Sequence, residues 1–409
     1  MQGRLRPAAL LRSATGARGR AEPQLRRAAD RQRQVGGGVS AARELAGAAR
    51  PVRSCLFVGL GGIGQRHLRN LRHLRGGEVE VHAFRVRRER HVVSDTLQLV
   101  HGEDVERKYE VQVHDELDAA LARKPDVVFV TNPSSFHVDI TRRALAAGAH
   151  VLVEKPLSHS LEGVAELVGD ARLRGLVGYV AYQLRFHPGF LRVQQILQQG
   201  LIGRPLFAEA TVGEYLPSFH PYEDYRRMYA SRRELGGGVT LSQIHEIDFL
   251  MALLGRPERV FSMGGKLSAL EVDVDDVSSS LLEFRGAEGR VLPVRLHQDF
   301  VQRPSERRTV IVGEAGKVEW SLSGKTLRRY ASDGSLCESQ DHSELARNAL
   351  FEAELSHFLS CVESGGAPCV SLTDGAQSLA VALAILESQK SGSPVNVGAV
   401  LDRAGLGAA

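Results

Sequence analysis

The pattern of apolar and polar positions changes partway along the chain, at about Phe186. Between Ser54 and that point, short runs rich in β-branched residues alternate with amphipathic helical stretches. This alternation is typical of a parallel sheet with helices on both faces, so we predict a doubly wound α/β half. Its expected strands are Ser54–Val58, Val79–Phe84, Val127–Val130, His150–Val153 and Gly178–Ala181, and its expected helices are Gln65–Arg75, Leu117–Arg123, His137–Ala147 and Leu161–Arg174.

Longer strand-like segments with alternating polarity follow, most of them without a helix in between, which favours an antiparallel sheet. Helices over Val239–Leu254 and Ala349–Glu363 flank these segments, so the second part is predicted as an α+β domain with a large open, mainly antiparallel sheet. The predicted domains are 51–182 and 183–400, preceded by an extension over 1–50 and followed by a tail over 401–409. The expected strands are Leu206–Tyr215, Val260–Lys266, Val277–Arg285, Val291–Phe300, Thr309–Val312 and Gly316–Ser321.

Length and composition agree with this division. A chain of 409 residues can bury two cores, and no apolar run approaches the roughly 18 to 20 residues that cross a bilayer. Four cysteines, too few for a disulfide scaffold, show no paired metal-ligand spacing. We therefore expect a cytoplasmic protein with reduced thiols, no metal and no membrane span.

The net charge of +4 comes from the N-terminal extension. Eleven arginines against three acids give residues 1–50 a charge of +8, which leaves −4 for the rest. Nucleic-acid binding needs basic residues gathered on a folded surface, so none is expected. The extension itself is interpreted as a disordered segment or an over-long start, with an organelle transit peptide as the alternative.

A glycine motif, Gly59-Leu60-Gly61-Gly62-Ile63-Gly64, lies between the first expected strand and the first expected helix. In a G-x-G-x-x-G motif the first glycine allows a tight turn, the second lets a pyrophosphate approach the backbone, and the third lets the helix pack closely. Free amides at the helix start then face the phosphates. This placement predicts a Rossmann-like dinucleotide site that includes Gly59, Gly61, Gly62, Ile63 and Gly64.

Arg85 ends the second expected strand, where NAD-specific sites usually carry an acid. Its guanidinium and that of Arg88 could pair with a 2′-phosphate, which favours NADP(H) over NAD(H). The alternative is a solvated loop at Arg87 and Arg88, with NAD(H) bound without the acid.

The strand His150–Val153 leads into Glu154-Lys155-Pro156 at the edge where open α/β sheets bind ligands. Together with the glycine motif, Thr131-Asn132-Pro133 and His137, this tripeptide resembles the Gfo/Idh/MocA family of oxidoreductases, of the glucose-fructose oxidoreductase and inositol dehydrogenase type. The resemblance runs from Val52 to about Val397. It also includes Gly178-Tyr179, Arg185-Phe186-His187-Pro188, and Gly236-Gly237-Gly238 followed by the helix that bears His245.

The resemblance implies hydride transfer between a nicotinamide cofactor and a sugar-like secondary alcohol or ketone, with Lys155 and His245 as catalytic residues. It adds Thr131, Asn132, Pro133, His137, Glu154 and Lys155 to the expected cofactor contacts. The chemistry of Lys155 and His245 suits these roles, because a lysine at a sheet edge can relay a proton and an imidazole titrates near neutrality. The alternatives are a surface Lys155 paired with Glu154 and a structural, hydrogen-bonded His245.

Helical spacing places Ser242, His245 and Asp248 on one side of their helix. Many relatives resemble one another in carrying an Asp where this chain has Ser242, and a hydroxyl cannot stabilise a protonated imidazole as a carboxylate does. Some similar members linked to sugar biosynthesis carry a hydroxyl there. A catalytically inactive dinucleotide sensor or structural protein is therefore the alternative function.

The loop from Glu214 to Arg226 is dense in aromatic rings, carboxylates and arginines, which suits a polyhydroxylated substrate. A polar connection or a subunit contact is the alternative. The resemblance further implies that the open sheet is covered in a homodimer or homotetramer. The expected substrate contacts are Tyr182, Arg185, His187, Arg226, Ser242 and Asp248.

Overall fold

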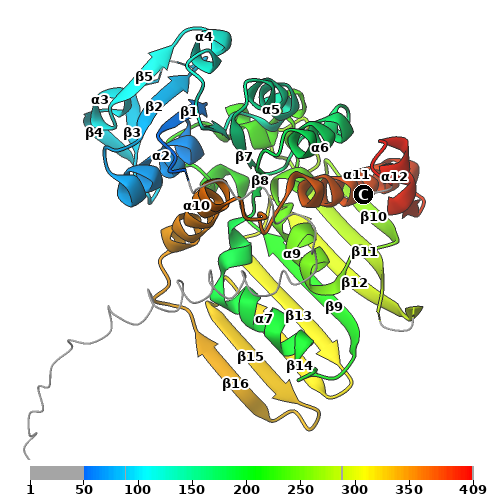
Figure 1. Ribbon diagram of the computed structural model, residues 1–409. Helices are drawn as coiled ribbons and strands as arrows, with labels where there is room; N and C mark the ends of the chain where they lie inside the picture. The colour runs from blue at the N-terminus through cyan, green and yellow to red at the C-terminus, as the bar shows by residue number, and fades with distance from the viewer. Residues whose placement is uncertain (1–49, 88, 287–288, 408–409) are drawn as a thin grey trace, which may run out of the picture.

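The computed structural model describes residues 50–87, 89–286 and 289–407 (Figure 1). An α/β part built on a parallel sheet lies beside a broad second sheet, and helices α10 and α11 from the end of the chain contact both parts. The extension 1–49 lies outside the described residues, as do Arg88 and the last two residues. Within the described ranges, no helix combines the length and the apolarity needed to span a membrane.

The N-terminal sheet has six parallel strands in the order β5-β2-β1-β6-β7-β8, which confirms the doubly wound fold. The order reverses direction beside β1, and this reversal opens the crevice where such sheets bind ligands. The strands are β1 Ser54–Val58, β2 Glu80–Phe84, β5 Val111–His114, β6 Val127–Val130, β7 His150–Glu154 and β8 Gly178–Ala181, and the helices are α2 Gly62–Arg75, α3 Val105–Lys108, α4 Leu117–Leu121, α5 His137–Ala146 and α6 Val164–Leu173.

Successive residues of each central strand point to opposite faces, as the strand period requires. Cys55 and Phe57 of β1 pack in a core with α2 and with α10, Arg347–Ser364. Leu56 and Val58 belong to a larger core with α4, α5, α6 and α11, Leu372–Ser391. Both faces of the sheet are therefore buried.

The second sheet has nine strands in the order β16-β15-β14-β13-β9-β12-β11-β10-β17. Only β9 and β12 pair in parallel, so the expectation of a mainly antiparallel sheet is confirmed. Its strands are β9 Pro205–Gly213, β10 Arg259–Gly265, β11 Val277–Arg285, β12 Val291–Asp299, β13 Glu306–Gly313, β14 Gly316–Ser321, β15 Thr326–Ala331, β16 Leu336–Asp341 and β17 Val395–Asn396, and its remaining helices are α7 Pro188–Gln198, α8 Val239–Ser242, α9 His245–Leu254 and α12 Val397–Arg403.

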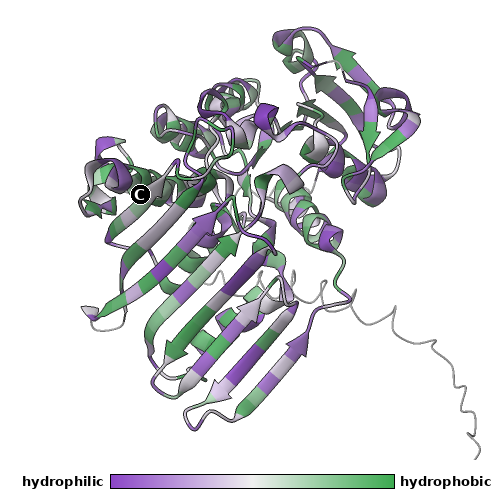
Figure 2. Ribbon diagram, turned by 180° about the vertical axis from the view of Figure 1, so that it is seen from behind, coloured by the Kyte–Doolittle hydropathy of each residue, from purple (hydrophilic) through white to green (hydrophobic). Residues whose placement is uncertain are grey.

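Helices α7, α9 and α11 cover one face of this sheet, and Figure 2 shows the other face without a helix over it in the described chain. On β10 and β11, Val260 and Leu282 are buried, whereas Phe261, Met263 and Leu281 are 37%, 69% and 54% exposed. The open face therefore carries apolar side chains at that edge.

Several elements were not anticipated from the sequence. A hairpin of β3, His91–Val93, and β4, Leu99–Asp104, is inserted between β2 and β5. The edge strands β5 and β16, and β15 beside β16, were not predicted either, because they alternate weakly between buried and exposed positions. The expected single helix over Val239–Leu254 is wrong at its middle, where Gln243 and Ile244 form a turn between α8 and α9.

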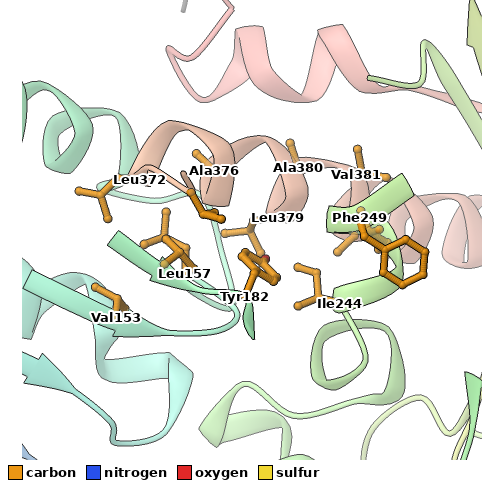
Figure 3. Close-up of a cluster of buried hydrophobic side chains, with 14 of the residues drawn as sticks. Val153, Leu157, Tyr182, Ile244, Phe249, Leu372, Ala376, Leu379, Ala380 and Val381 are labelled. Carbon is orange, nitrogen blue, oxygen red and sulfur yellow. The ribbon is translucent and has the colours of Figure 1, made fainter. Parts of the chain in front are cut away.

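Helix α11 joins the two parts of the molecule. Its Leu372 and Ala376 contact the side of the parallel sheet, near Val153 and Leu157, while Ala380 and Val381 lie toward Phe249 of α9 (Figure 3). Tyr182 and Ile244 lie between these groups in the same cluster. The continuous core fixes the end of β7 relative to the turn before α9, and this is where the expected catalytic residues lie.

Candidate active site

The glycine motif forms the turn between β1 and α2. Gly59 has φ of +99°, in the region that favours glycine, and its amide donates to the Phe84 carbonyl over 3.1 Å. A Cβ on Gly64 would lie 2.4 Å from the Gly59 carbonyl oxygen, so a side chain there would push α2 away from the turn. Both glycines are thus needed to bring the helix start against the sheet.

The start of α2 has room for a phosphate. Gly61 precedes the helix without a side-chain cap, and a Cβ built on it meets nothing within 4 Å. The amides of the first turn, including those of Gly62 and Ile63, have no intrahelical acceptor. These residues fit the diphosphate of a dinucleotide, because an anion can approach the backbone and satisfy its free donors.

The loop after β6 forms the neighbouring wall. The Thr131 hydroxyl donates to the Gly59 carbonyl over 2.7 Å. The His137 ring lies between two backbone oxygens, with Nε2 2.8 Å from that of Asn132 and Nδ1 2.9 Å from that of Pro156. His137 is buried, so it braces the loop Thr131–Pro133 against the segment after Lys155.

The guanidinium of Arg85 is buried and already bound to other groups of the protein. Its side chain is only 3% exposed, and its Nη1 lies 2.6 Å from Oε1 of Glu106, while Nη2 donates to the Glu89 carbonyl. Arg87 remains exposed, and Arg88 lies outside the described residues. A 2′-phosphate would therefore meet Arg85 already paired with a carboxylate, which the sequence pattern did not indicate.

Lys155 follows β7 directly and points to the second domain. Its Nζ donates to the Ser242 carbonyl over 2.7 Å. Glu154 instead contacts His67, with Oε1 2.8 Å from Nε2, and accepts the backbone N–H of Lys155 over 3.2 Å. The alternative of a surface lysine paired with the Glu154 side chain is therefore not what the structure shows.

The turn between α8 and α9 makes this contact available. In an unbroken helix the Ser242 carbonyl would accept the amide four residues on. Here Gln243 leaves the helix: its side-chain amide donates to the Asp299 carbonyl over 3.1 Å, and its own carbonyl accepts from Gln298 over 2.9 Å. The freed Ser242 carbonyl then holds the ammonium of Lys155.

His245 is the first residue of α9 and is 5% exposed. Its ring meets that of Tyr182 edge-on at 5.6 Å, and its Nδ1 has no hydrogen-bond partner among the described residues. Burial lowers the pKa of His245 well below its usual value, and the positive charge of Lys155 lowers it further. The imidazole is therefore neutral at physiological pH, as a general base must be.

The other expected substrate residues already have protein partners. Arg185 forms a two-pronged ion pair with Asp248, with Nε to Oδ2 at 2.7 Å and Nη2 to Oδ1 at 2.9 Å. His187 caps α7 by accepting the Gly189 amide over 2.9 Å. Arg226 pairs with Glu271, Nε to Oε2 at 2.6 Å. Substrate contact by Arg185, His187, Arg226 and Asp248 stays a prediction. A substrate would have to bind beside the present partner of each side chain or replace it.

A buried carboxyl group lies on α10, outside the site residues expected from the sequence. Glu354 is fully buried, and neither of its oxygens has a hydrogen-bond partner among the described residues. Burial raises the pKa of Glu354 well above its ordinary value of 4.5, and the negative charges of Glu154 and Asp248 raise it further. Glu354 therefore keeps its proton to a higher pH than a solvent-exposed glutamate does.

We expect Glu354→Gln to stabilise the protein increasingly as the pH rises. The folded state keeps a proton that the unfolded state releases above its pKa of about 4.5, so the wild type loses about 1.4 kcal/mol per pH unit until the folded pKa is reached. Glutamine is neutral throughout. Urea unfolding at about pH 4 and about pH 8 measures the difference, with Glu344→Gln, an exposed carboxylate, as control. An equal difference at both pH values would contradict the raised pKa of Glu354.

Two family models match the chain. The first, described as an oxidoreductase family with an NAD-binding Rossmann fold, matches residues 53–182, and the second, the GFO/IDH/MocA C-terminal domain, matches residues 190–319. The chain belongs to the Gfo/Idh/MocA family of oxidoreductases. This confirms the resemblance drawn from the glycine motif and from the tripeptide at Lys155. Among the described residues, no group of three or more His, Cys, Asp or Glu side chains is placed to hold a metal ion.

Characterised relatives in this family are dehydrogenases and reductases. The chain is 28% identical to 1,5-anhydro-D-fructose reductase of Ensifer adhaerens over 68% of its own length and 82% of the relative's. It is 25% identical to scyllo-inositol 2-dehydrogenase (NAD(+)) of Bacillus subtilis, over 84% of its own length and 96% of the relative's. It is 31% identical to trans-1,2-dihydrobenzene-1,2-diol dehydrogenase of Oryctolagus cuniculus, over 60% and 73%.

Solved structures share the fold. The WlbA dehydrogenase of Bordetella pertussis, in complex with NADH and UDP-GlcNAcA, superposes with a TM-score of 0.68 at 23% identity, covering 85% of this chain and 99% of that one. UDP-N-acetylglucosamine 3-dehydrogenase GnnA of Acidithiobacillus ferrooxidans gives a TM-score of 0.64 at 23% identity, covering 83% and 98%.

Proposed function

We propose that the protein transfers a hydride, in either direction, between NADP(H) or NAD(H) and a secondary alcohol or ketone of a sugar, cyclitol or nucleotide-linked sugar. The observation that carries this proposal is the contact of Lys155 with the segment just before His245, at the same edge of the parallel sheet as the turn Gly59–Gly64, called the glycine cradle below. A cation and a neutral base lie together there at the carboxyl edge of the parallel sheet, where these folds bind ligands.

The two side chains divide the work on the substrate oxygen. The bound nicotinamide would give or take the hydride. His245, neutral and without a hydrogen-bond partner at Nδ1 among the described residues, accepts the hydroxyl proton of an alcohol or returns it to a ketone. Lys155 steadies the negative charge that develops on the oxygen, and the Ser242 carbonyl holds its ammonium in place. Ser242 thus contributes its backbone, and no carboxylate at position 242 is required for that contact.

The substrate class rests on the relatives and on the loop that follows β9. Relatives named for anhydrofructose and inositol, and a structural neighbour bound to UDP-GlcNAcA, all concern polyhydroxylated rings. The loop 214–227 supplies carboxylates, tyrosines and arginines that suit such rings.

The test is turnover on a panel of sugars, inositols and UDP-sugars with NADP(H) and NAD(H), followed by the absorbance of reduced nicotinamide. Turnover that depends on Lys155 is expected. A protein that binds the cofactor yet turns over no member of the panel would support the alternative of an inactive sensor.

We further propose that NADP(H) is preferred, because Arg85 replaces the usual acid and Arg87 adds a second, exposed charge. Arg85→Gln is expected to weaken NADPH binding about tenfold or more, since a charge-assisted contact is lost, and to change NADH binding little. Glu106→Gln releases Arg85 and should strengthen NADPH binding. Fluorescence titration measures both, with the exposed Arg172→Gln as control. Equal losses for both cofactors would argue against the preference.

The open face of the second sheet is proposed as the contact surface of a homodimer or homotetramer. Its exposed Phe261, Met263 and Leu281 would leave water on association. Light scattering of the purified protein tests this, and a monomer at all concentrations would contradict it.

A further inference from the structure

One side chain of the second domain lies at the start of α2. Tyr222 belongs to the loop 214–227 that follows β9, yet its ring contacts His91 of the inserted hairpin edge-on, with centroids 6.4 Å apart. It also stacks on His220, at 5.5 Å between centroids and an interplanar angle of 15°. The loop therefore spans from the substrate domain to the nucleotide-binding domain.

The hydroxyl of Tyr222 lies close to Gly62, one residue of the glycine cradle. A Cβ built on Gly62, the first residue of α2, would be 2.6 Å from the Tyr222 Oη and 3.9 Å from Leu97. Gly62 is not in a left-handed conformation, so backbone freedom does not explain it. Its missing side chain instead makes room for the phenol beside the free amides of the first turn.

The hydroxyl is available as a donor at this position. Burial, helped by Glu223 and Glu89 and opposed by Arg66, raises the pKa of Tyr222 to about 12, so its proton stays on. Arg66 adds a positive charge close to the same helix turn, with Nη2 bonded to the Asp95 carbonyl over 2.8 Å.

We propose that the Tyr222 hydroxyl donates a hydrogen bond to the diphosphate of the bound dinucleotide and closes the cradle from the substrate domain. This inference rests on the proposed function, because it needs the dinucleotide at Gly61 and Gly62. The phosphate oxygens would then lie between the amides of α2 and a phenol delivered by the other domain. Release of the cofactor requires the loop 214–227 to lift from α2.

Other contacts hold the loop in this position. His220 Nδ1 lies 2.6 Å from Oε1 of Glu223. Farther along, the Tyr225 hydroxyl accepts the Glu271 amide over 3.2 Å. Tyr225 belongs to the same loop but turns to the second domain, which makes it a matched control for the loss of a loop-holding hydroxyl.

The test compares Tyr222→Phe, Tyr225→Phe and wild type in titrations with NADPH, NADH and ADP-ribose, and in stopped-flow dissociation of the reduced cofactor. We expect Tyr222→Phe to weaken all three ligands about tenfold, because each carries the diphosphate, and to speed dissociation by a similar factor. Tyr225→Phe should stay within about twofold of wild type.

Two results would overturn the inference. Tyr222→Phe could bind ADP-ribose as tightly as wild type, which would remove the diphosphate contact. Both variants could instead weaken binding equally, which would show that loop order alone matters. Failure of the proposed function is distinguishable from either, because then the wild type itself would bind none of the three ligands.

Discussion

Lys155→Ala is expected to lower kcat by about a thousandfold while the affinity for NADPH stays near that of wild type. The variant loses the only cation that the end of β7 directs toward the turn before His245 in the described structure. The glycine cradle does not depend on this side chain, because its amides belong to the turn after β1. Steady-state turnover and cofactor titration on the same preparation separate the two effects.

A matched control and a conservative variant sharpen this expectation. Lys317→Ala removes a partly exposed lysine of β14 and should leave turnover unchanged. Lys155→Arg keeps the charge but not the shape of the ammonium, so partial activity is expected. Turnover by Lys155→Ala within about tenfold of wild type would remove Lys155 from the catalytic step.

His245→Asn is expected to lower kcat by about a hundredfold or more, because the amide cannot take a proton from the substrate hydroxyl. The burial of His245 should also affect the pH dependence of kcat/KM in the wild type. A base works in its neutral form, which is present above its pKa, and burial places the pKa of His245 well below 6.5. The value of kcat/KM should therefore not fall between about pH 7 and about pH 6 on account of this group.

Measurement of kcat/KM from about pH 5 to about pH 9 checks this, with His101→Asn on an exposed strand position as control. An acid limb centred at the ordinary pKa of histidine that disappears in His245→Asn would show a solvated imidazole. Full activity of His245→Asn would show that another group takes the proton.

The elements of the N-terminal half could be predicted because local patterns determine them. Buried strands such as Val127–Val130 are continuous apolar runs. The glycines of the turn after β1 are required because a side chain at Gly59 or Gly64 would clash with atoms close to that turn. The placement of Lys155 followed in the same way, since the carboxyl ends of parallel strands share one edge. The extent of the second sheet was underestimated, because its edge strand β16 and the neighbouring β15 have few buried side chains.

Contacts between distant residues could not be predicted. The turn that splits the expected helix is held by Gln298 and Asp299 of β12, and nothing near Gln243 in sequence signals it. The ion pairs Arg185–Asp248 and Arg85–Glu106 join residues that come together only in the folded structure, so the sequence does not indicate them. A signal for Glu354 did exist, because helical spacing places it on the same face as Phe351 and Phe358.

The most direct test of a dinucleotide-dependent oxidoreductase is titration of the purified wild-type protein with NADPH and with NADH, following nicotinamide fluorescence. We expect saturable binding of both, tighter for NADPH, and displacement by ADP-ribose, since we propose that the cradle at Gly59, Gly61 and Gly64 recognises the diphosphate. Absence of binding by either cofactor would contradict the function proposed for this chain and leave only the shared fold.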